Sequence, residues 1–180
     1  MLWGIDSARL TSFLDSEYLD YAIIEAEHAP RTLYQINSMT TALRNKNITS
    51  IVRITSPNPE IAGATIDAGA DGILVPYCEN IEELKLSFGR TYFNPLKGEY
   101  LKKVLDTGEF PSKKSEDYLR EKSKSRLFIL GVESVPAVEN LENMINSVEN
   151  IDGIFVGPND LTTSMGLSLI HISEPTRRSY

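Results

Sequence analysis

The stretch Arg126–Leu161, RLFILGVESVPAVENLENMINSVENIDGIFVGPNDL, contains two apolar runs separated by a helical pattern. The first run, Arg126–Gly131, and the second, Ile151–Val156, each end where polar residues begin. Between them, Pro136–Asn146 has apolar residues at helical spacing. This order predicts a strand, a helix and a second strand, which together make a βαβ unit of a parallel sheet.

An acidic residue follows each of these two predicted strands. Glu133 lies in GVES after the first strand, and Asp160 lies in GPND after the second. The carboxyl ends of neighbouring parallel strands meet at one edge of a sheet, and a (β/α) barrel places its chemistry there. Carboxylate oxygens are ligands that Mg²⁺ and Mn²⁺ accept. Glu133 and Asp160 are therefore candidate ligands of a divalent metal ion.

The composition is typical of one globular domain. The chain has 180 residues, of which 41% are hydrophobic and 24% charged. No apolar run approaches the roughly 20 residues of a membrane span, and the opening MLWGIDSARL lacks the pattern of a signal peptide, so we expect a cytoplasmic protein without a membrane partner. A net charge of -7 without a basic patch argues against nucleic acid as a partner. The lone Cys78 cannot form an internal disulfide.

The rest of the chain repeats the alternation of strand and helix. Four further strands are predicted, at Leu2–Asp6, Leu19–Glu25, Ser50–Ile54 and Gly72–Pro76. Helical patterns are predicted around Leu10–Leu14, over Thr32–Asn45, after Pro57 and from Asn80. From Gly89 to Ser125 the pattern loosens into a long excursion, whose charged run from Ser112 predicts a solvated helix face. Six alternating strands predict an α/β fold with a parallel sheet.

The two ends of this pattern suggest an incomplete barrel. A closed eight-stranded barrel usually needs about 250 residues, so two β-α units are expected to be missing after Gly166. The segment Leu167–Arg177, LSLIHISEPTR, resembles the translation of a transposon-type sequencing adapter. We therefore expect residues 1–166 to be a partial barrel domain and residues 167–180 to be a non-native tail.

Polar side chains gather at the carboxyl ends of the predicted strands. They are Glu25, Glu27, His28, Arg53, Glu133 and Asp160. Each has a structural alternative when taken singly: His28 as a structural histidine, Arg53 as the partner of a core carboxylate, and Glu133 as an acid at a helix N-terminus. Their joint placement at one edge favours a functional site, because crowded charges need a compensating ion or ligand.

Four motifs in this order resemble one known family. They are EHAPRT from Glu27, VRITSPNPEIAGATIDAGADGILVP from Val52, GVES from Gly131 and GIFVGPNDL from Gly153. Together they resemble the HpcH/HpaI aldolase and citrate lyase family, specifically its metal-dependent 2-keto-3-deoxy acid aldolases. The resemblance runs from about Trp3 to Gly166.

The resemblance implies a (β/α)8 TIM barrel that reversibly cleaves a 4-hydroxy-2-oxo acid into pyruvate and an aldehyde. It implies that Glu133 and Asp160 bind Mg²⁺, Mn²⁺ or Co²⁺, which would act as a Lewis acid on the substrate's 2-oxo group. Arg53 matches the arginine that neutralises the enolate oxygen. The remaining matches are His28 as the acid/base histidine, Asp67 as the carboxylate that orients it, and Gly157, Pro158 and Asn159 as backbone lining the substrate-carboxylate pocket.

The match is not complete, and other interpretations stay open. Glu25 stands where relatives commonly have Asp, Gly131 where some have Gln, and Asn94–Gly98 keeps only part of the usual Pro-x-Gly-x-Arg-Gly loop. A citryl-CoA or malyl-CoA type lyase is a second enzyme interpretation. A truncated, poorly soluble and non-catalytic fragment is an interpretation of another class, because open sheet edges favour association. The resemblance also implies a hexameric parent protein; the aldehyde partner stays open.

Overall fold

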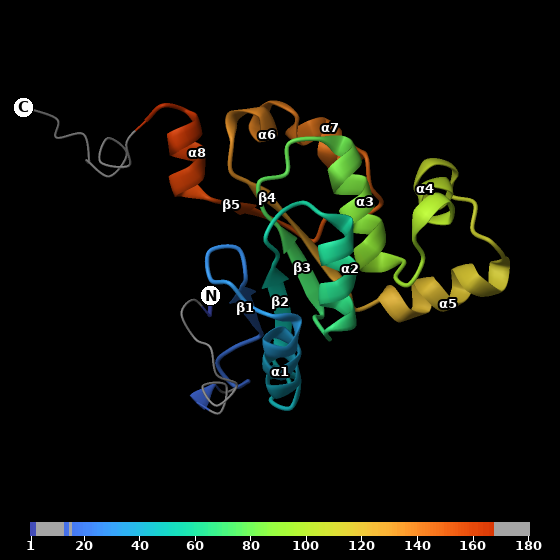
Figure 1. The fold of residues 1–180 in the computed structure, drawn as a ribbon, viewed down its shortest axis with the longest axis horizontal. Helices are drawn as coiled ribbons and strands as arrows, with labels where there is room; N and C mark the ends of the chain where they lie inside the picture. The colour runs from blue at the N-terminus through green and yellow to red at the C-terminus, as the bar shows by residue number, and fades with distance from the viewer. Residues whose placement is uncertain (3–12, 15, 168–180) are drawn as a thin grey trace, which may run out of the picture.

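Five apolar segments form one parallel sheet in the computed structural model, which describes residues 1–2, 13–14 and 16–167 of the chain (Figure 1). The strands are β1 (Tyr21–Glu25), β2 (Thr49–Arg53), β3 (Gly72–Val75), β4 (Leu127–Val132) and β5 (Gly153–Val156). They are hydrogen-bonded in sequence order, β1-β2-β3-β4-β5, and every pair is parallel. The predicted α/β class with a parallel sheet is confirmed.

The two predicted ends of the chain fall largely outside this description. The strand expected at Leu2–Asp6 and most of the helix expected around Leu10–Leu14 lie outside the described residues, as does the expected tail beyond Leu167. The described part includes Leu2, which forms an isolated parallel bridge with Ile24 of β1.

Burial explains the composition of the strands. All four residues of β3 are buried, as expected for a central parallel strand with both faces covered. In β5, at the edge of the described sheet, burial alternates, and Ile154 and Val156 remain 46% and 51% exposed. Only one face of β5 is thus covered by the described part of the chain.

Three helices cover one face of the sheet and run side by side in Figure 1. They are α1 (Leu33–Arg44), α2 (Pro59–Asp67) and α3 (Ile81–Tyr92). Each begins with a side-chain cap: Thr32 forms a capping box with Gln35, and Asn58 and Asn80 accept backbone N–H groups of the first turn. Their N-termini follow the carboxyl ends of β1, β2 and β3, so these caps lie at the edge where the predicted site residues are found.

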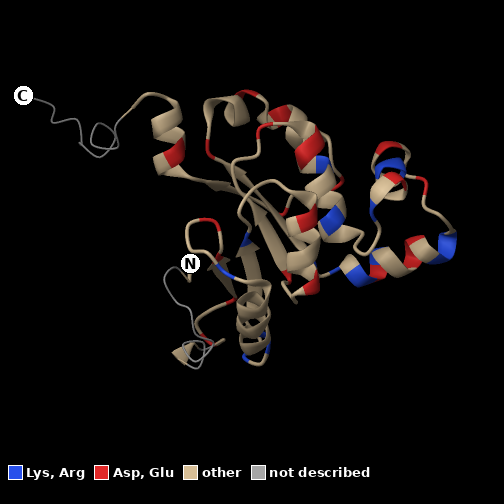
Figure 2. Cartoon of the chain, viewed as in Figure 1, with Lys and Arg blue, Asp and Glu red and all other residues tan. Residues whose placement is uncertain are grey.

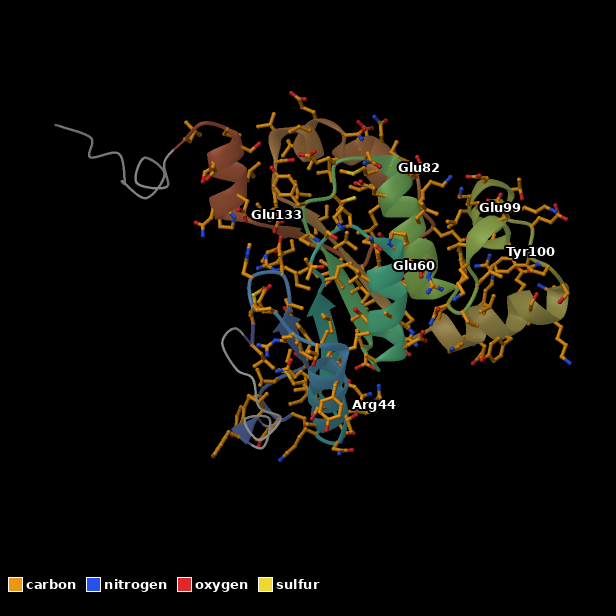
Figure 3. The ribbon with its side chains drawn as sticks, viewed as in Figure 1. Arg44, Glu60, Glu82, Glu99, Tyr100 and Glu133 are labelled. Atoms are coloured by element: carbon orange, nitrogen blue, oxygen red, sulfur yellow. The ribbon has the colours of Figure 1, made fainter. Side chains whose placement is uncertain are left out.

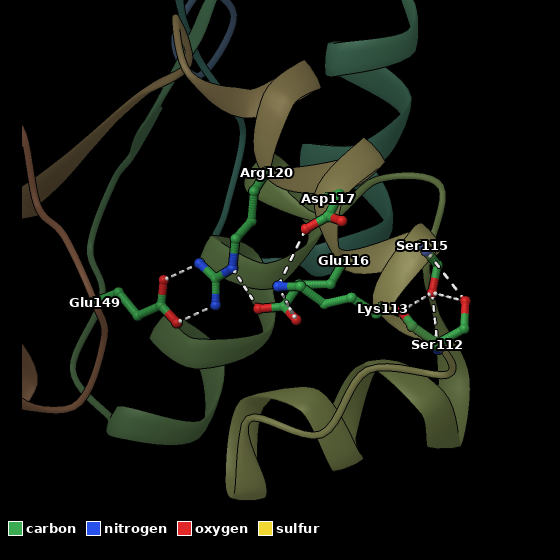
Figure 4. Close-up of polar contacts among 7 residues, drawn as sticks. All are labelled: Ser112, Lys113, Ser115, Glu116, Asp117, Arg120 and Glu149. Atoms are coloured by element: carbon green, nitrogen blue, oxygen red, sulfur yellow. Dashed lines mark hydrogen bonds and ion pairs between the residues drawn. The ribbon is translucent and has the colours of Figure 1, made fainter.

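The predicted excursion between β3 and β4 is more ordered than its sequence pattern suggested. After α3 it contains α4 (Gly98–Thr107), which buries Leu101 and Val104, and α5 (Lys113–Ser123). Charges of both signs alternate along α5 (Figure 2), which confirms the prediction of a solvated helix face. Arg120 of α5 makes two hydrogen bonds to Glu149, of 3.0 and 3.2 Å (Figure 4), so that α5 is joined to the loop before β5.

The helix predicted over Pro136–Asn146 is divided into two short helices. These are α6 (Val135–Glu139) and α7 (Leu141–Asn146), separated at Asn140. The side-chain amide of Asn140 donates a hydrogen bond of 3.2 Å to the carbonyl of Glu79, which holds the joint against the loop after β3. The last described helix, α8 (Pro158–Ser164), follows β5 directly.

Candidate functional site

The carboxyl ends of β1 and β2 place Glu25 beside Arg53. The two residues are direct partners in the parallel register. Both are buried, and Glu25 Oε2 accepts hydrogen bonds from Arg53 Nε at 2.8 Å and pairs with Nη2 at 2.7 Å. The guanidinium also lies 5.9 Å from the ring centre of Phe155 on β5. Such a two-nitrogen contact fixes the direction of the guanidinium.

The turn after β1 is organised by the same Glu25. Its second carboxylate oxygen, Oε1, accepts hydrogen bonds from the backbone N–H groups of Glu27 at 2.8 Å and His28 at 3.0 Å. This places the half-exposed imidazole of His28 at the opening of the site. Glu27 Oε2 lies 3.0 Å from Arg53 Nη1 and 3.5 Å from His28 Nε2. Glu27 is thus the carboxylate that faces both predicted catalytic groups.

Glu133 lies at the carboxyl end of β4, with its side chain fully buried. Figure 3 shows it at the opposite edge of the sheet from Arg44, which ends α1. Glu133 Oε2 accepts a 2.9 Å hydrogen bond from the backbone N–H of Tyr77, and Oε1 lies 3.4 Å from Arg53 Nη1. Burial raises the pKa of Glu133, against the opposing effects of the Tyr77 N–H and Arg53, and the charge of Asp160 raises the pKa further.

The turn from β5 to α8 lies directly against Glu133. A Cβ atom built on Gly157 would lie 2.6 Å from Glu133 Oε1 and 2.7 Å from Cγ, so a side chain at this position would require Glu133 or the turn to shift. Asp160 is in the first turn of α8, three residues beyond Gly157, and is partly exposed. Gly157 is buried, whereas Pro158 and Asn159 are exposed.

Four acidic side chains gather at this edge of the sheet, and a divalent cation would offset their charge. Glu25, Glu27 and Glu133 all contact the same cation, Arg53, and Asp160 adds a further negative charge near Glu133. Burial raises the pKa of Glu27 as well as that of Glu133, which reflects the cost of holding this excess charge. Within the described ranges, no three or more His, Cys, Asp or Glu residues are grouped to hold a metal. A pair of carboxylates that leaves the other positions to water and substrate suits Mg²⁺.

The structure of one chain does not bring Asp67 to His28. Asp67 is the last residue of α2, and its carboxylate accepts a 2.6 Å hydrogen bond from the side chain of Asn94. A helix that follows a parallel strand runs back along the sheet, so its last residue lies at the amino edge, away from His28. Asn94, the first residue of the incomplete loop motif, lies at that edge as well. Among the described residues, the carboxylate paired with the imidazole is that of Glu27, 3.5 Å away, which the sequence had placed at the site without a specific role.

Two further features of the described residues are the state of Cys78 and the character of the helices. Cys78 is free and buried, and burial raises the pKa of its thiol to about 12, so it is not a nucleophile at neutral pH. No helix in the described part of the chain has the length and apolar character needed to cross a membrane.

The comparison with known families decides the classification. A family model described as HpcH/HpaI aldolase/citrate lyase matches residues 3–171. The chain belongs to the HpcH/HpaI aldolase/citrate lyase family. The resemblance based on the four motifs is thereby confirmed.

Curated relatives of this family member are aldolases. A hydroxypyruvate/pyruvate aldolase from Roseovarius nubinhibens is 27% identical over 167 residues, which cover 91% of this chain and 63% of the relative. A 5-keto-4-deoxy-D-glucarate aldolase from Klebsiella pneumoniae is 29% identical over 159 residues, which cover 87% of this chain and 60% of the relative. The chain therefore spans about three fifths of the length of these relatives.

A solved structure supports the fold. The HpcH/HpaI aldolase from Desulfitobacterium hafniense matches with a TM-score of 0.72 and 21% identity, over 91% of this chain and 62% of that one. The parallel sheet and its helices are consistent with part of the barrel predicted for this family. The number of β-α units in the whole barrel stays a prediction.

Proposed function

We propose that the chain is part of a divalent-metal-dependent class II aldolase that cleaves a 4-hydroxy-2-oxo acid into pyruvate and an aldehyde, reversibly. The observation that supports it most is the placement of Glu133 against Gly157, three residues before Asp160, with Arg53 Nη1 3.4 Å from Glu133 Oε1. Two carboxylates able to hold a metal ion and a fixed guanidinium at one sheet edge are groups suited to stabilising a pyruvate enolate.

Each residue has a distinct part in this proposal. Glu133 and Asp160 would hold Mg²⁺, Mn²⁺ or Co²⁺, which when bound supplies Lewis-acid polarisation of the 2-oxo group. Arg53, whose direction Glu25 fixes, donates hydrogen bonds to the oxygen that gains negative charge as the carbon–carbon bond breaks. Because Arg53 is already oriented before the reaction, little reorganisation is needed at that moment.

His28 is the proton-exchanging group of the proposal. Its imidazole is half exposed, on a turn held by two hydrogen bonds to Glu25, and so is open to a substrate that enters from solvent. Histidine changes its charge near neutral pH, as removal of the 4-hydroxyl proton during cleavage requires. The backbone of Gly157, Pro158 and Asn159 stays the predicted lining of the substrate-carboxylate pocket.

Binding of Mn²⁺ and pyruvate to the 180-residue chain tests the site. Isothermal titration should detect Mn²⁺ binding that Glu133→Gln and Asp160→Asn weaken by at least about tenfold, and pyruvate binding that requires the ion. Glu142→Gln is a matched control, because Glu142 is an exposed acid on α7. Pyruvate binding that persists in excess chelator, or in Glu133→Gln, would contradict the proposal.

Turnover is measured on the protein that contains the chain, after its coding DNA has been sequenced past the codon for Gly166. We expect pyruvate release from 2-keto-3-deoxy acids with Mn²⁺ or Mg²⁺, and loss of release with chelator. Cleavage of citryl-CoA or malyl-CoA in place of a free 2-oxo acid would favour the lyase alternative. Absence of any turnover in this longer protein would favour the non-catalytic alternative.

Several expectations remain predictions. They are the hexameric assembly of the parent protein, its cytoplasmic location, the absence of nucleic-acid and membrane partners, and the inactivity of the chain taken alone.

A further inference from the structure

The three carboxylates around Arg53 are not held alike. Glu25 takes one edge of the guanidinium, at 2.8 Å from Nε and 2.7 Å from Nη2. The remaining nitrogen, Nη1, is shared by Glu27 Oε2 at 3.0 Å and Glu133 Oε1 at 3.4 Å. An anion that approaches Nη1 would therefore have to compete with the carboxylates of Glu27 and Glu133.

Glu27 is the least firmly held of the three. Glu25 also accepts two backbone N–H groups, and Glu133 accepts one from Tyr77. Glu27 Oε2 is buried and accepts no well-aligned hydrogen bond from the residues that the structure describes. A buried carboxylate oxygen without such a bond is costly to keep in place.

A second partner lies within reach of the same oxygen. His28 Nε2 is 3.5 Å from Glu27 Oε2, on the neighbouring residue of the same turn. His28 is 52% exposed and Glu27 16% exposed, so the pair lies at the solvent side of Arg53. Glu27 Oε2 thus lies between its two partners, 3.0 Å from Arg53 Nη1 and 3.5 Å from His28 Nε2.

We propose that Glu27 is a positioning residue that occupies Arg53 Nη1 until an anionic oxygen of the substrate takes its place, and that it then pairs with His28 Nε2. The proposal rests on the proposed function and assigns the group that Nη1 recognises, a carboxylate or enolate oxygen. The exchange links substrate binding at Arg53 to the orientation of His28. It also provides, within one chain, the carboxylate partner of His28 that Asp67 does not provide.

The test compares wild type, Glu27→Gln and Glu60→Gln for binding of pyruvate at saturating Mn²⁺. Glutamine keeps the shape of Glu27 but loses the charge that competes for Nη1, so Glu27→Gln should bind pyruvate about fivefold more tightly, a change that corresponds to about 1 kcal/mol. Glu60→Gln should match wild type, because Glu60 lies 3.7 Å from Arg90, is 71% exposed and is not among the contacts of Arg53. Glu27→Asp, which keeps the charge on a shorter side chain, should fall between wild type and Glu27→Gln.

A kinetic measurement separates positioning from a merely structural role. In the turnover-competent protein, Glu27→Gln should lower KM for the 2-oxo acid and also lower kcat, because the competitor is gone but His28 has lost its partner. Pyruvate affinity that is unchanged or weaker in Glu27→Gln, with wild-type binding intact, overturns this proposal alone. If the wild-type turnover-competent protein binds no pyruvate with any divalent ion, the proposed function is refuted, and the exchange with it.

Discussion

Replacement of Gly157 by alanine tests the closest contact of the proposed metal site. The added methyl carbon would lie 2.6 Å from Glu133 Oε1, 2.7 Å from Cγ and 2.9 Å from Cδ, whereas ordinary contact begins at 3.4 Å. The backbone angles of Gly157, φ -87° and ψ 95°, are open to alanine, so the clash is the main effect. Either the buried carboxylate or the β5–α8 turn must move by about 0.8 Å to restore contact distance.

The expected cost of this clash follows from overpacking in other cores. It is about 1–3 kcal/mol, which lowers the melting temperature of a chain of this size by roughly 3–9 °C. Because Glu133 and Asp160 move apart or turn, Mn²⁺ affinity should fall at least about tenfold. Thermal unfolding and isothermal titration measure the two effects.

Gly153→Ala, at the start of the strand that precedes Gly157, is the matched control. Its added carbon would lie 3.8 Å from Ile129 Cγ1, which is ordinary contact, so both the melting temperature and the Mn²⁺ affinity should stay near wild type. If Gly157→Ala behaves like this control in both measurements, Glu133 does not press against Gly157 and the argument for the metal pair fails.

Three further predictions concern the charges around Arg53. A carboxyl whose pKa is raised by folding contributes most to stability below about pH 4.5, and less as the pH rises through its folded pKa. Glu133→Gln should therefore have a higher melting temperature than wild type at pH 7, and the difference should shrink toward pH 4.5. A difference in melting temperature that does not change with pH would contradict this prediction. Arg53→Met leaves Glu25 and Glu133 buried without their cation, so it should lower the free energy of unfolding in urea by about 3 kcal/mol or more. Arg44→Met is the control, because the side chain of Arg44 is 58% exposed. A similar loss of stability in both variants would show that the effect is not specific to Arg53. Tyr77 has a φ of 47° and its backbone N–H donates to Glu133. Tyr77→Gly should keep the Mn²⁺ affinity, because glycine adopts this angle and retains the N–H, whereas Tyr77→Pro, which lacks the N–H, should weaken it. Equal Mn²⁺ affinities of the two variants would show that the N–H does not hold Glu133.

Local sequence patterns predicted the regular elements well where strong local signals were present. The helix expected over Thr32–Asn45 is α1, because a capping box starts it and apolar residues recur at helical spacing. The five described strands were each predicted from a short apolar or β-branched run, and β3, which is buried throughout, contains no polar side chain. The helix over Pro136–Asn146 was predicted as one piece, because the bond from Asn140 to Glu79 that holds its joint joins residues 61 positions apart.

The site, too, could be predicted where local signals decide it and not where contacts between distant residues do. The edge of the sheet that collects Glu25, Arg53, Glu133 and Asp160 could be predicted from the sequence, because parallel strands joined by helices bring their carboxyl ends together. Asp67 was expected beside His28 from the resemblance alone, and the direction of α2 places it at the other edge within one chain.

The sequence by itself determined the class of fold, the family and the edge at which charged residues gather, because periodicity, caps and motifs are local properties of the chain. Only the tertiary structure decided which atoms meet there. The pairing of Glu25 with Arg53 depends on strand register, and the position of Glu27 between Arg53 and His28 depends on a turn held by Glu25. The fit of Gly157 against Glu133 depends on the packing of β5 beside β4, and such distances between remote residues are set by the packed sheet as a whole.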